Sequence, residues 1–166
     1  AERAATFVAQ HLVTDEGALK RVYRANAAKH NGYLEDYAFF ADGLLALYAA
    51  TGTRRWLDLA TVVVDQMVSR FWDTQGGGFF YSQEGGKDLI VRVKKATDSA
   101  LPSANAVAVR CLITLARQSG REDLRMKAAT CDGCDENQPS NQAHCCENYF
   151  PRAPVMILTS QCSCAM

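Results

Sequence analysis

The sequence predicts a mainly α-helical protein in which antiparallel helical hairpins are joined by one inserted β-hairpin. Two long segments with helical spacing of apolar residues, 34–50 and 55–71, are separated by a very short turn, and helices joined in this way run antiparallel. A glycine-rich stretch followed by alternating residues then predicts two short strands. A second pair of helical segments follows, and its polar start, roughly seventy residues after that of the first, indicates a stacked repeat.

The two helices of the first hairpin differ in character. The segment 34–50 is apolar almost all round, which is typical of a helix inside a layered assembly, and it ends at Gly52, where glycine takes the left-handed conformation without a Cβ clash. The segment 55–71 alternates apolar with charged residues and is expected to be an outer, one-sided helix. Before them, residues 4–12 have near-helical spacing and residues 19–23 fit a short extended piece.

The rest of the chain divides at about residue 130. The β-hairpin is expected at about 78–95, a third helix opens at Pro102-Ser103, and a fourth, outer helix begins at Arg121. Helical spacing is lost after residue 130. We therefore expect a helical-hairpin domain over 1–130 and a divergent cysteine-rich tail over 131–166, with a last helix from about residue 151.

Composition excludes several classes of function. The 166 residues carry 18 basic and 18 acidic side chains, so bulk charge does not favour nucleic acid or an anionic membrane as a partner. No apolar run approaches the roughly 20 residues of a membrane span, no secretory leader is recognisable, and a cytoplasmic location is expected. No phosphate-binding glycine loop precedes a helix, so nucleotide binding is not indicated. No cofactor is expected apart from the zinc ion that one interpretation of the tail allows.

Several motifs together resemble a known family. They are Gly-Tyr-Leu-Glu-Asp-Tyr-Ala-Phe at 32–39, Leu-Tyr-x-x-Thr-Gly at 47–52, Trp56-Leu57, Phe71-Trp72-Asp73 with Gly77-Gly78-Phe79-Phe80, and Asp98-x-Ala100-x-Pro102-Ser103-x-Asn105. Residues 1 to about 129 resemble the C-terminal helical region of the thioredoxin-domain-containing, spermatogenesis-associated protein family. The resemblance implies an (α/α)₆ toroid, similar to sugar epimerases of the N-acylglucosamine type and to several glycosidases, in which the ends of inner helices line a central cavity.

The chain also departs from that family. Ser99 and Ala104 stand where the family has glycine, and the thioredoxin-like domain with its Cys-x-x-Cys pair lies outside this sequence. About three hairpins are present where a closed toroid has six. The expected fold is therefore a partial toroid whose partners include the rest of a longer chain.

Three acids are the candidate catalytic residues. Glu35 and Asp36 at one helix start, with Asp98 before the next inner helix, would converge on one cavity and perform epimerase-like or glycosidase-like acid/base chemistry on a sugar. The alternative is that these carboxylates only cap helices, where free N–H groups and the macrodipole stabilise them. The three histidines, His11, His30 and His144, lie in no epimerase motif.

Polar and aromatic residues near the same helix ends are candidates for ligand binding. Ser103, Asn105, Arg92 and Lys94 suit hydroxyl and anion recognition, and Tyr37, Trp72, Phe79 and Phe80 suit an apolar wall for sugar stacking. Equally, such aromatics complete cores and such cations face water.

The cysteines of the last third allow three interpretations. Cys131, Cys134, His144 and Cys145 supply enough ligands for a tetrahedral zinc ion, although their spacing matches no familiar zinc module. Disulfides would require an oxidising compartment. The interpretation we favour is a diverged segment that replaces an ordinary outer helix.

Taken together, these residues favour a carbohydrate-binding or carbohydrate-processing toroid segment with a sugar-like small molecule as its partner. The first alternative is a non-enzymatic interaction scaffold whose activity lies in the redox domain or in a partner. The second is a zinc-binding tail module.

Overall fold

The structure, a computed structural model, describes residues 1–84, 92–94 and 101–131. The described residues all belong to one compact unit, Ala1–Gly133. In chain order they form α1 (Glu2–His11), β1 (Lys20–Arg24), β2 (Ala27–Asn31), α2 (Leu34–Thr51), α3 (Arg54–Phe71), α4 (Ala104–Ser119) and α5 (Glu122–Ala129). The prediction of a mainly helical protein is confirmed, and the small antiparallel sheet of the described residues is formed by β1 and β2.

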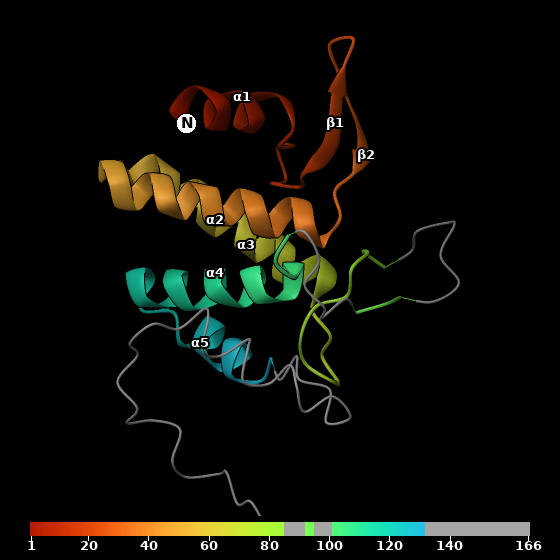
Figure 1. Cartoon of the computed structure of the whole chain (residues 1–166), viewed down its shortest axis with the longest axis vertical. Coiled ribbons are helices and arrows are strands. Elements are labelled where there is room, and N and C mark those ends of the chain that lie inside the picture. Colours follow the sequence, from red (N-terminus) through yellow and green to blue (C-terminus); the bar gives the residue numbers. More distant parts are fainter. Residues whose placement is uncertain (85–91, 95–100, 132–166) are drawn as a thin grey trace, which may run out of the picture. The chain divides into compact units, whose positions relative to one another are not determined.

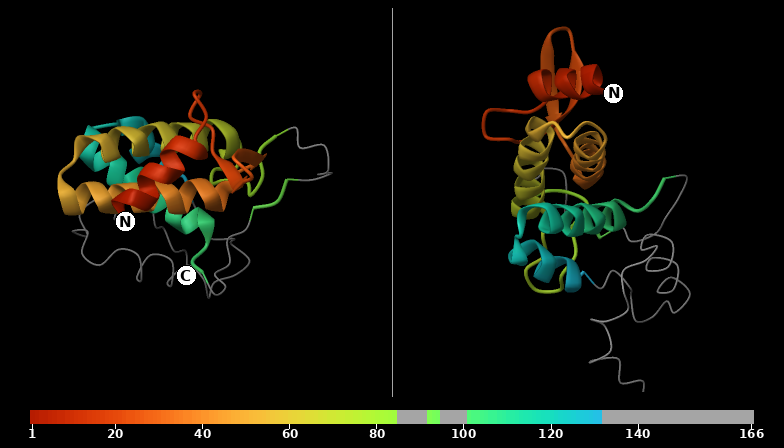
Figure 2. Two further views of the ribbon diagram at one scale, coloured as in Figure 1. Left: turned by 90° about the horizontal axis from the view of Figure 1, so that it is seen from above. Right: turned by 90° about the vertical axis from the view of Figure 1, so that its left-hand side faces the viewer.

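Helices α2, α3 and α4 pack together around the core, and α5 covers α4 (Figures 1 and 2). A turn of only two residues makes α2 and α3 antiparallel neighbours, as the sequence predicts. Gly52 and Gly120 end α2 and α4 in the left-handed conformation, with φ of 67° and 70°. Among the largest fully buried side chains are Tyr37, Leu44, Val63, Met67, Phe71, Phe79, Leu112 and Leu115.

Tyr37 shows how α2 is fixed in this core. Its ring lies edge-on to Phe71, with 5.2 Å between centroids, and its side chain is 1% exposed. The backbone N–H of Leu19 donates to the Tyr37 hydroxyl over 2.7 Å. The hydroxyl therefore satisfies a buried backbone group of the segment that leads into β1.

Contacts between α2 and α4 include one polar and one sulfur contact. The Arg110 guanidinium donates to both carboxylate oxygens of Asp42, at 3.1 and 2.6 Å, at the edge of the interface. Inside it, the Cys111 sulfur lies 3.6 Å from the Ala38 carbonyl oxygen, and burial raises the pKa of this thiol to about 12. Cys111 is thus the small core residue that the sequence indicates.

The two-stranded sheet lies earlier in the chain than the hairpin that the sequence predicts. Strands β1 and β2 pair antiparallel from Lys20↔Asn31 to Arg24↔Ala27. Ala25 and Asn26 both have positive φ, 51° and 57°, so the strands are joined by a two-residue turn of the kind that hairpin twist favours. The extended piece expected at 19–23 is present, whereas its partner β2 was not predicted, because Ala-Asn is a weak turn signal.

The expected hairpin at about 78–95 lies partly outside the described residues. In its described part, Phe79 forms an isolated antiparallel bridge with Trp72. The backbone N–H of Tyr81 donates to the Val93 carbonyl over 2.8 Å. We refer to residues 72–82 as the aromatic loop. Within the described ranges, no helix combines the length and apolarity that crossing a bilayer requires.

Candidate functional site

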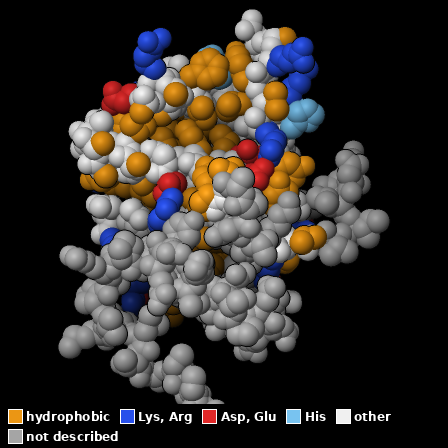
Figure 3. Space-filling model, in the orientation of Figure 1, with side chains coloured by type: hydrophobic (Ala, Val, Ile, Leu, Met, Phe, Trp, Pro, Cys, Tyr) orange, Lys and Arg blue, Asp and Glu red, His pale blue; other side chains and the backbone are white. Residues whose placement is uncertain are grey.

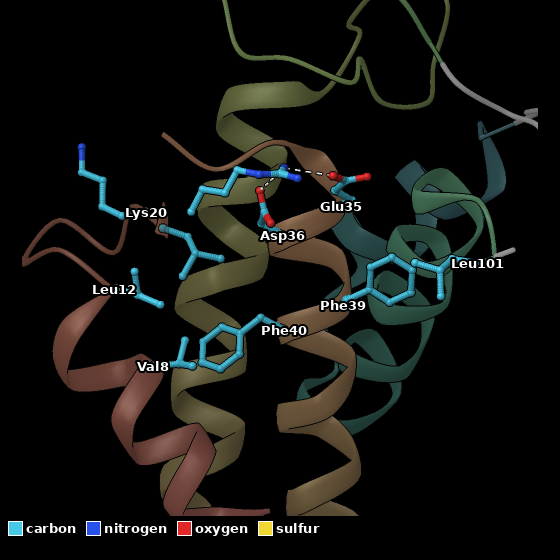
Figure 4. A pocket seen from close by; sticks show the side chains of 10 residues that line it. Val8, Leu12, Lys20, Glu35, Asp36, Phe39, Phe40 and Leu101 are labelled. Atoms are coloured by element: carbon cyan, nitrogen blue, oxygen red, sulfur yellow. Dashed lines mark hydrogen bonds and ion pairs between the residues drawn. The ribbon is translucent and has the colours of Figure 1, made fainter. Parts of the chain in front are cut away.

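Glu35 and Asp36 lie side by side in the first turn of α2 and share one cationic partner. Nη1 of Arg21, which β1 supplies, lies 2.9 Å from Glu35 Oε1 and 3.0 Å from Asp36 Oδ2 (Figure 4). The side chain of Arg21 is 37% exposed, that of Glu35 35% and that of Asp36 23%. The ion pairs are therefore open to solvent along one side.

The two carboxylates are held differently. Asp36 Oδ2 also accepts the backbone N–H of Tyr33 over 2.8 Å, so Asp36 caps its own helix, as the sequence alternative proposes. Glu35 Oε1 instead accepts the hydroxyl of Tyr81 over 3.1 Å, from the aromatic loop. All the partners of Glu35 in the described residues are tertiary ones, so helix capping does not explain Glu35.

Two tyrosines complete this cluster. The rings of Tyr33 and Tyr81 stack with centroids 5.0 Å apart and planes 13° apart, and the Arg21 guanidinium carbon lies 5.1 Å from the centre of the Tyr33 ring. Partial burial, and then the negative charge of Glu35, raise the pKa of the Tyr81 phenol, while the hydrogen bond to Glu35 raises the pKa of Arg21. We call Arg21, Tyr33, Glu35, Asp36 and Tyr81 the polar rim.

An open groove of about 400 Å³ begins at the polar rim and follows α2. It is lined by Val8, Leu12, Leu19, Lys20, Arg21, Glu35, Asp36, Phe39, Phe40 and Leu101. Figure 4 shows Val8, Leu12 and Phe40 along one side, Phe39 beside Leu101 on the other, and the two acids at one end. Figure 3 shows hydrophobic side chains gathered on this face of the molecule over α1 and α2.

The helical repeat explains why acids and aromatics meet here. Residues four apart are neighbours on a helix surface, so Phe39 lies one turn after Glu35 and Phe40 one turn after Asp36. Phe39 is 36% exposed and Leu101 is 64% exposed, and both are large apolar side chains. The groove thus has charged groups at its head and an apolar wall along its length.

The aromatic residues predicted to form a stacking wall lie elsewhere. Tyr37 and Phe79 are buried in the core, at 1% and 0% exposure. Trp72 is half-buried, meets Phe79 edge-on with centroids 5.1 Å apart, and has the Lys127 ammonium 5.2 Å from its ring. None of these three lines the groove.

Arg92 and Lys94 contact the aromatic loop. Arg92 donates to the carbonyls of Arg70 and Ser82, at 3.0 and 3.1 Å, and its guanidinium carbon lies 4.1 Å from the centre of the Phe80 ring. Lys94 Nζ lies 2.6 Å from Asp73 Oδ2 and donates to the Gly77 carbonyl, also over 2.6 Å. The hydrogen bond from Lys94, and then those from nearby backbone N–H groups, lower the pKa of Asp73 to about 2.

Ser103 and Asn105 lie at the start of α4 on the other side of this loop. Ser103 is buried at the N-cap position, with 6% exposure. The Asn105 amide pairs with the backbone of Phe79: Oδ1 accepts its N–H over 2.8 Å, and Nδ2 donates to its carbonyl over 3.0 Å. Asn105 therefore fixes the loop that carries Tyr81 to the polar rim.

Other predicted site residues lie outside the described ranges. They are Asp98 and, of the possible zinc ligands, Cys134, His144 and Cys145; Cys131 is described and half-buried. In the part of the chain that the structure describes, no three His, Cys, Asp or Glu residues come close enough to hold a metal ion. Convergence of Asp98 on the other two acids, and zinc binding by the tail, stay predictions.

Sequence reasoning missed several site residues, among them Arg21, Tyr33, Phe39, Tyr81 and Leu101. The spacing of Phe39 from Glu35 was a usable signal, because it places the ring on the same helical face as the acid. Arg21 and Tyr81 carried no such signal, since each reaches Glu35 from a distant segment.

Fold and site together define a class of helical-hairpin protein with a small-molecule-sized groove at the start of a central helix. No protein-family model matches the chain. The chain is 40% identical to spermatogenesis-associated protein 20 of Rattus norvegicus over 133 residues. The match covers 74% of this chain and 17% of the relative. The protein of that name from Homo sapiens is 45% identical over 93 residues, 55% of this chain and 12% of the relative.

A nematode relative matches a similar length. An uncharacterised protein of Caenorhabditis elegans is 33% identical over 139 residues, 79% of this chain and 19% of the relative. The chain is therefore homologous to a segment of spermatogenesis-associated protein 20, and it spans less than a fifth of the length of each of these relatives. This homology confirms the spermatogenesis-associated part of the resemblance.

Proposed function

We propose that the chain is part of an (α/α)₆ toroid and that its groove binds a carbohydrate-like ligand. Support for a larger assembly comes from the homology, because the relatives are more than five times as long as the matched segment. In this proposal further helical hairpins complete the toroid, and a thioredoxin-like domain belongs to the same protein.

One observation carries the ligand proposal: Arg21 bridges Glu35 and Asp36 at the head of an apolar groove. A sugar ring has hydroxyl groups around its edge and C–H groups on its faces, so it needs convergent polar groups beside an apolar wall. The polar rim supplies the first and Phe39 with Leu101 the second. The groove volume of about 400 Å³ lies within the range of small-molecule sites.

Binding is the role that the described residues support best. Acid/base catalysis on a glycosidic bond needs one protonated carboxylic acid and one carboxylate. Glu35 and Asp36 instead both lie within 3.0 Å of the same guanidinium, which is an arrangement of two carboxylates. A reaction of epimerase or glycosidase type would draw its acid from outside this pair, and Asp98 is the residue that the sequence offers.

The test is a matched pair of variants of the full chain. With a panel of neutral sugars, we expect at least one sugar to raise the melting temperature, because a ligand that binds only the folded state stabilises it. Glu35→Gln should abolish that rise. Glu122→Gln should keep it, since Glu122 pairs with Arg125 on α5, away from the groove. A panel in which no sugar changes the melting temperature or gives a saturation-transfer NMR signal would refute carbohydrate binding.

A second candidate, the interaction scaffold, is favoured by the capping contact of Asp36 with Tyr33. In that case Asp36 has a structural role only, through its capping contact and its ion pair with Arg21, and Asp36→Ala should lower the free energy of unfolding by about 0.3–1 kcal/mol. The scaffold candidate predicts this loss without any sugar response in the unmodified chain. A sugar response that Glu35→Gln removes would exclude it.

A further inference from the structure

We propose that the hairpin of β1 and β2 is a docking surface for an acidic polypeptide segment. The face of the hairpin that points away from the helices carries this proposal. It consists of Lys20, Val22, Arg24 and Lys29, and we call these four residues the basic face. The proposal is independent of carbohydrate binding, because Val22, Arg24 and Lys29 do not line the groove.

Positive charge is concentrated in the hairpin although the whole chain is neutral. Residues 17–34 contain four Lys or Arg residues and His30, whereas all 18 Asp and Glu residues of the chain lie outside this segment. Figure 3 shows Lys, Arg and His side chains gathered at the upper right, where Figure 1 places the hairpin. A protein without net charge can therefore still attract an anionic partner to this place.

The two faces of the hairpin differ in what they contact. Side chains alternate along a strand, so Arg21 and Tyr23 share one face of β1. Arg21 contacts α2 through its ion pairs with the two acids of the polar rim. Tyr23 contacts α1, where its ring centroid lies 5.5 Å from that of Phe7 and 4.7 Å from that of His11. The basic face is the opposite one and is turned away from both helices.

The basic face places three cations around one exposed apolar side chain. Lys29 lies opposite Val22 in the strand register, and Lys20 and Arg24 lie on either side of Val22 along β1. Val22 is 41% exposed, and Arg24 and Lys29 are exposed too. The distance along β1 from Lys20 to Arg24 is about 13 Å. An extended segment with a carboxylate at every second residue matches this surface, because its carboxylates follow one another at about 7 Å on the same side.

The cations of the basic face are not neutralised by carboxylates of the described residues. Within residues 1–84, 92–94 and 101–131, no Asp or Glu forms an ion pair with Lys20, Arg24 or Lys29. The Lys20 ammonium donates to Asn31 Oδ1 over 2.8 Å, which is an uncharged partner. Hydrogen bonds within its own loop, and only to a smaller extent the charge of Lys20, lower the pKa of Glu16. An acidic partner therefore gains ion pairs here without breaking existing ones.

The residues of the basic face favour a polypeptide over a nucleic acid or a membrane. Proteins that bind single-stranded nucleic acid stack its bases on aromatic rings, but Tyr23 of β1 packs against α1 instead. Recognition of anionic lipids typically uses clusters of about four to eight Lys or Arg residues, which is more than this face has. An apolar centre with a polar rim is typical of protein–protein interfaces. The expected partner is therefore an acidic segment with apolar residues between its carboxylates.

The test measures the binding of short synthetic peptides to the full chain by fluorescence anisotropy. In the first peptide glutamate alternates with valine, and in the control peptide glutamine replaces glutamate. We expect the glutamate peptide to bind about tenfold more tightly than the glutamine peptide, because only the former can pair with the three cations. Amide NMR signals of residues 20–31 should shift when the glutamate peptide is added, which locates the site in the unmodified chain.

Variants of exposed residues test each part of the surface. Arg24→Gln with Lys29→Gln removes two charges from the basic face and should weaken binding of the glutamate peptide about fivefold. Arg54→Gln with Arg117→Gln removes the same charge from exposed positions on α3 and α4 and should leave the affinity unchanged. Val22→Thr keeps a β-branched side chain and should weaken binding of the peptide, but not that of inorganic polyphosphate.

Two further anions decide the class of partner: an oligouridylate, and vesicles of phosphatidylcholine with phosphatidylserine. If either binds more tightly than the glutamate peptide, the assignment of a polypeptide partner is wrong. Equal weakening by both pairs of cation variants would show that overall charge attracts the peptide, and would overturn the hairpin as the site. A glutamate peptide that does not bind, or that leaves the signals of residues 20–31 unchanged, also overturns the proposal. None of these results bears on sugar binding in the groove.

Discussion

Tyr37 and Phe39 lie two residues apart on α2, yet one belongs to the core and the other to the groove. Tyr37 is 1% exposed and packs against Phe71, whereas Phe39 is 36% exposed and lies beside Leu101. The difference shows that a helix that is apolar all round need not be buried all round. The apolar face that the core leaves uncovered is where α2 offers a surface to a ligand.

The core and the polar rim also differ in how completely their polar groups are hydrogen-bonded. In the core, the Tyr37 hydroxyl accepts the Leu19 N–H, and no buried side-chain nitrogen or oxygen of the described residues lacks a partner. At the polar rim, Arg21, Glu35 and Asp36 have partners, but their side chains are still partly exposed to solvent. Polar groups that all have hydrogen-bond partners are typical of a structural region. Polar groups that remain accessible for further hydrogen bonds are typical of a recognition surface.

The largest expected effect is the contrast between Tyr37→Ala and Phe39→Ala. Tyr37→Ala leaves a cavity in the core and should cost about 3–5 kcal/mol of unfolding free energy, measured by urea denaturation. Phe39→Ala removes a partly exposed ring and should cost about 1 kcal/mol or less, while it weakens any sugar binding. Equal losses of stability in the two variants would contradict the division of α2 into a core face and a groove face.

The second largest effect is expected from removing the hydrogen bond between the Leu19 N–H and the Tyr37 hydroxyl. Tyr37→Phe keeps the ring but leaves the buried Leu19 N–H without its acceptor, so it should cost about 1–3 kcal/mol. Hydrogen exchange of the Leu19 amide should accelerate in this variant. An unchanged exchange rate would mean that this hydroxyl does not hold the segment before β1, and Tyr81→Phe, on the polar rim, serves as the matched control.

A smaller effect is expected at the edge between α2 and α4. Arg110→Gln removes the two hydrogen bonds to Asp42, whose side chain is 36% exposed. Solvent screens such a pair, so the loss should be about 0.2–1 kcal/mol and should shrink as salt is added. A loss as large as that of Tyr37→Phe would place this ion pair in the core.

The smallest effect concerns the loop that carries Tyr81. The pKa of Asp73 is about 2 in the folded protein, below its ordinary value of 3.8, so Asp73 binds its proton more weakly when folded. Its contribution to stability is therefore full above pH 3.8 and is lost as the pH falls through about 2. Carbon NMR of the Asp73 carboxyl should give the midpoint, and Lys94→Met should move it upward. A midpoint that Lys94→Met leaves in place would show that Lys94 does not stabilise the Asp73 carboxylate.

Local patterns in the sequence were enough for most of the helices. The periodicity and Gly52 placed α2, Pro102-Ser103 placed the start of α4, and the charged alternation placed α3. Strand β2 was missed because a hairpin with a weak turn depends on its neighbours. The motifs at 32–39 and 71–80 were enough to recognise homology to the spermatogenesis-associated relatives.

Some site residues could be predicted from local sequence patterns, and others could not. Glu35 and Asp36 were predictable because acids in the first turn of an apolar helix stand out in the sequence. Their partners were not, since Arg21 and Tyr81 are 14 and 46 residues away from Glu35. Arg92 and Asn105 look like ligand-binding residues in the sequence, but the structure shows that they hold the aromatic loop.

By itself, then, the sequence determined where the helices begin and end, because the spacing of apolar residues and the conformational freedom of glycine act over a few residues. Only the tertiary structure decided which face of α2 is buried. A helix that is apolar on nearly every side has no single face that its sequence marks for burial, so the packing of α3 and α4 selects the core face and leaves Phe39 beside the acids.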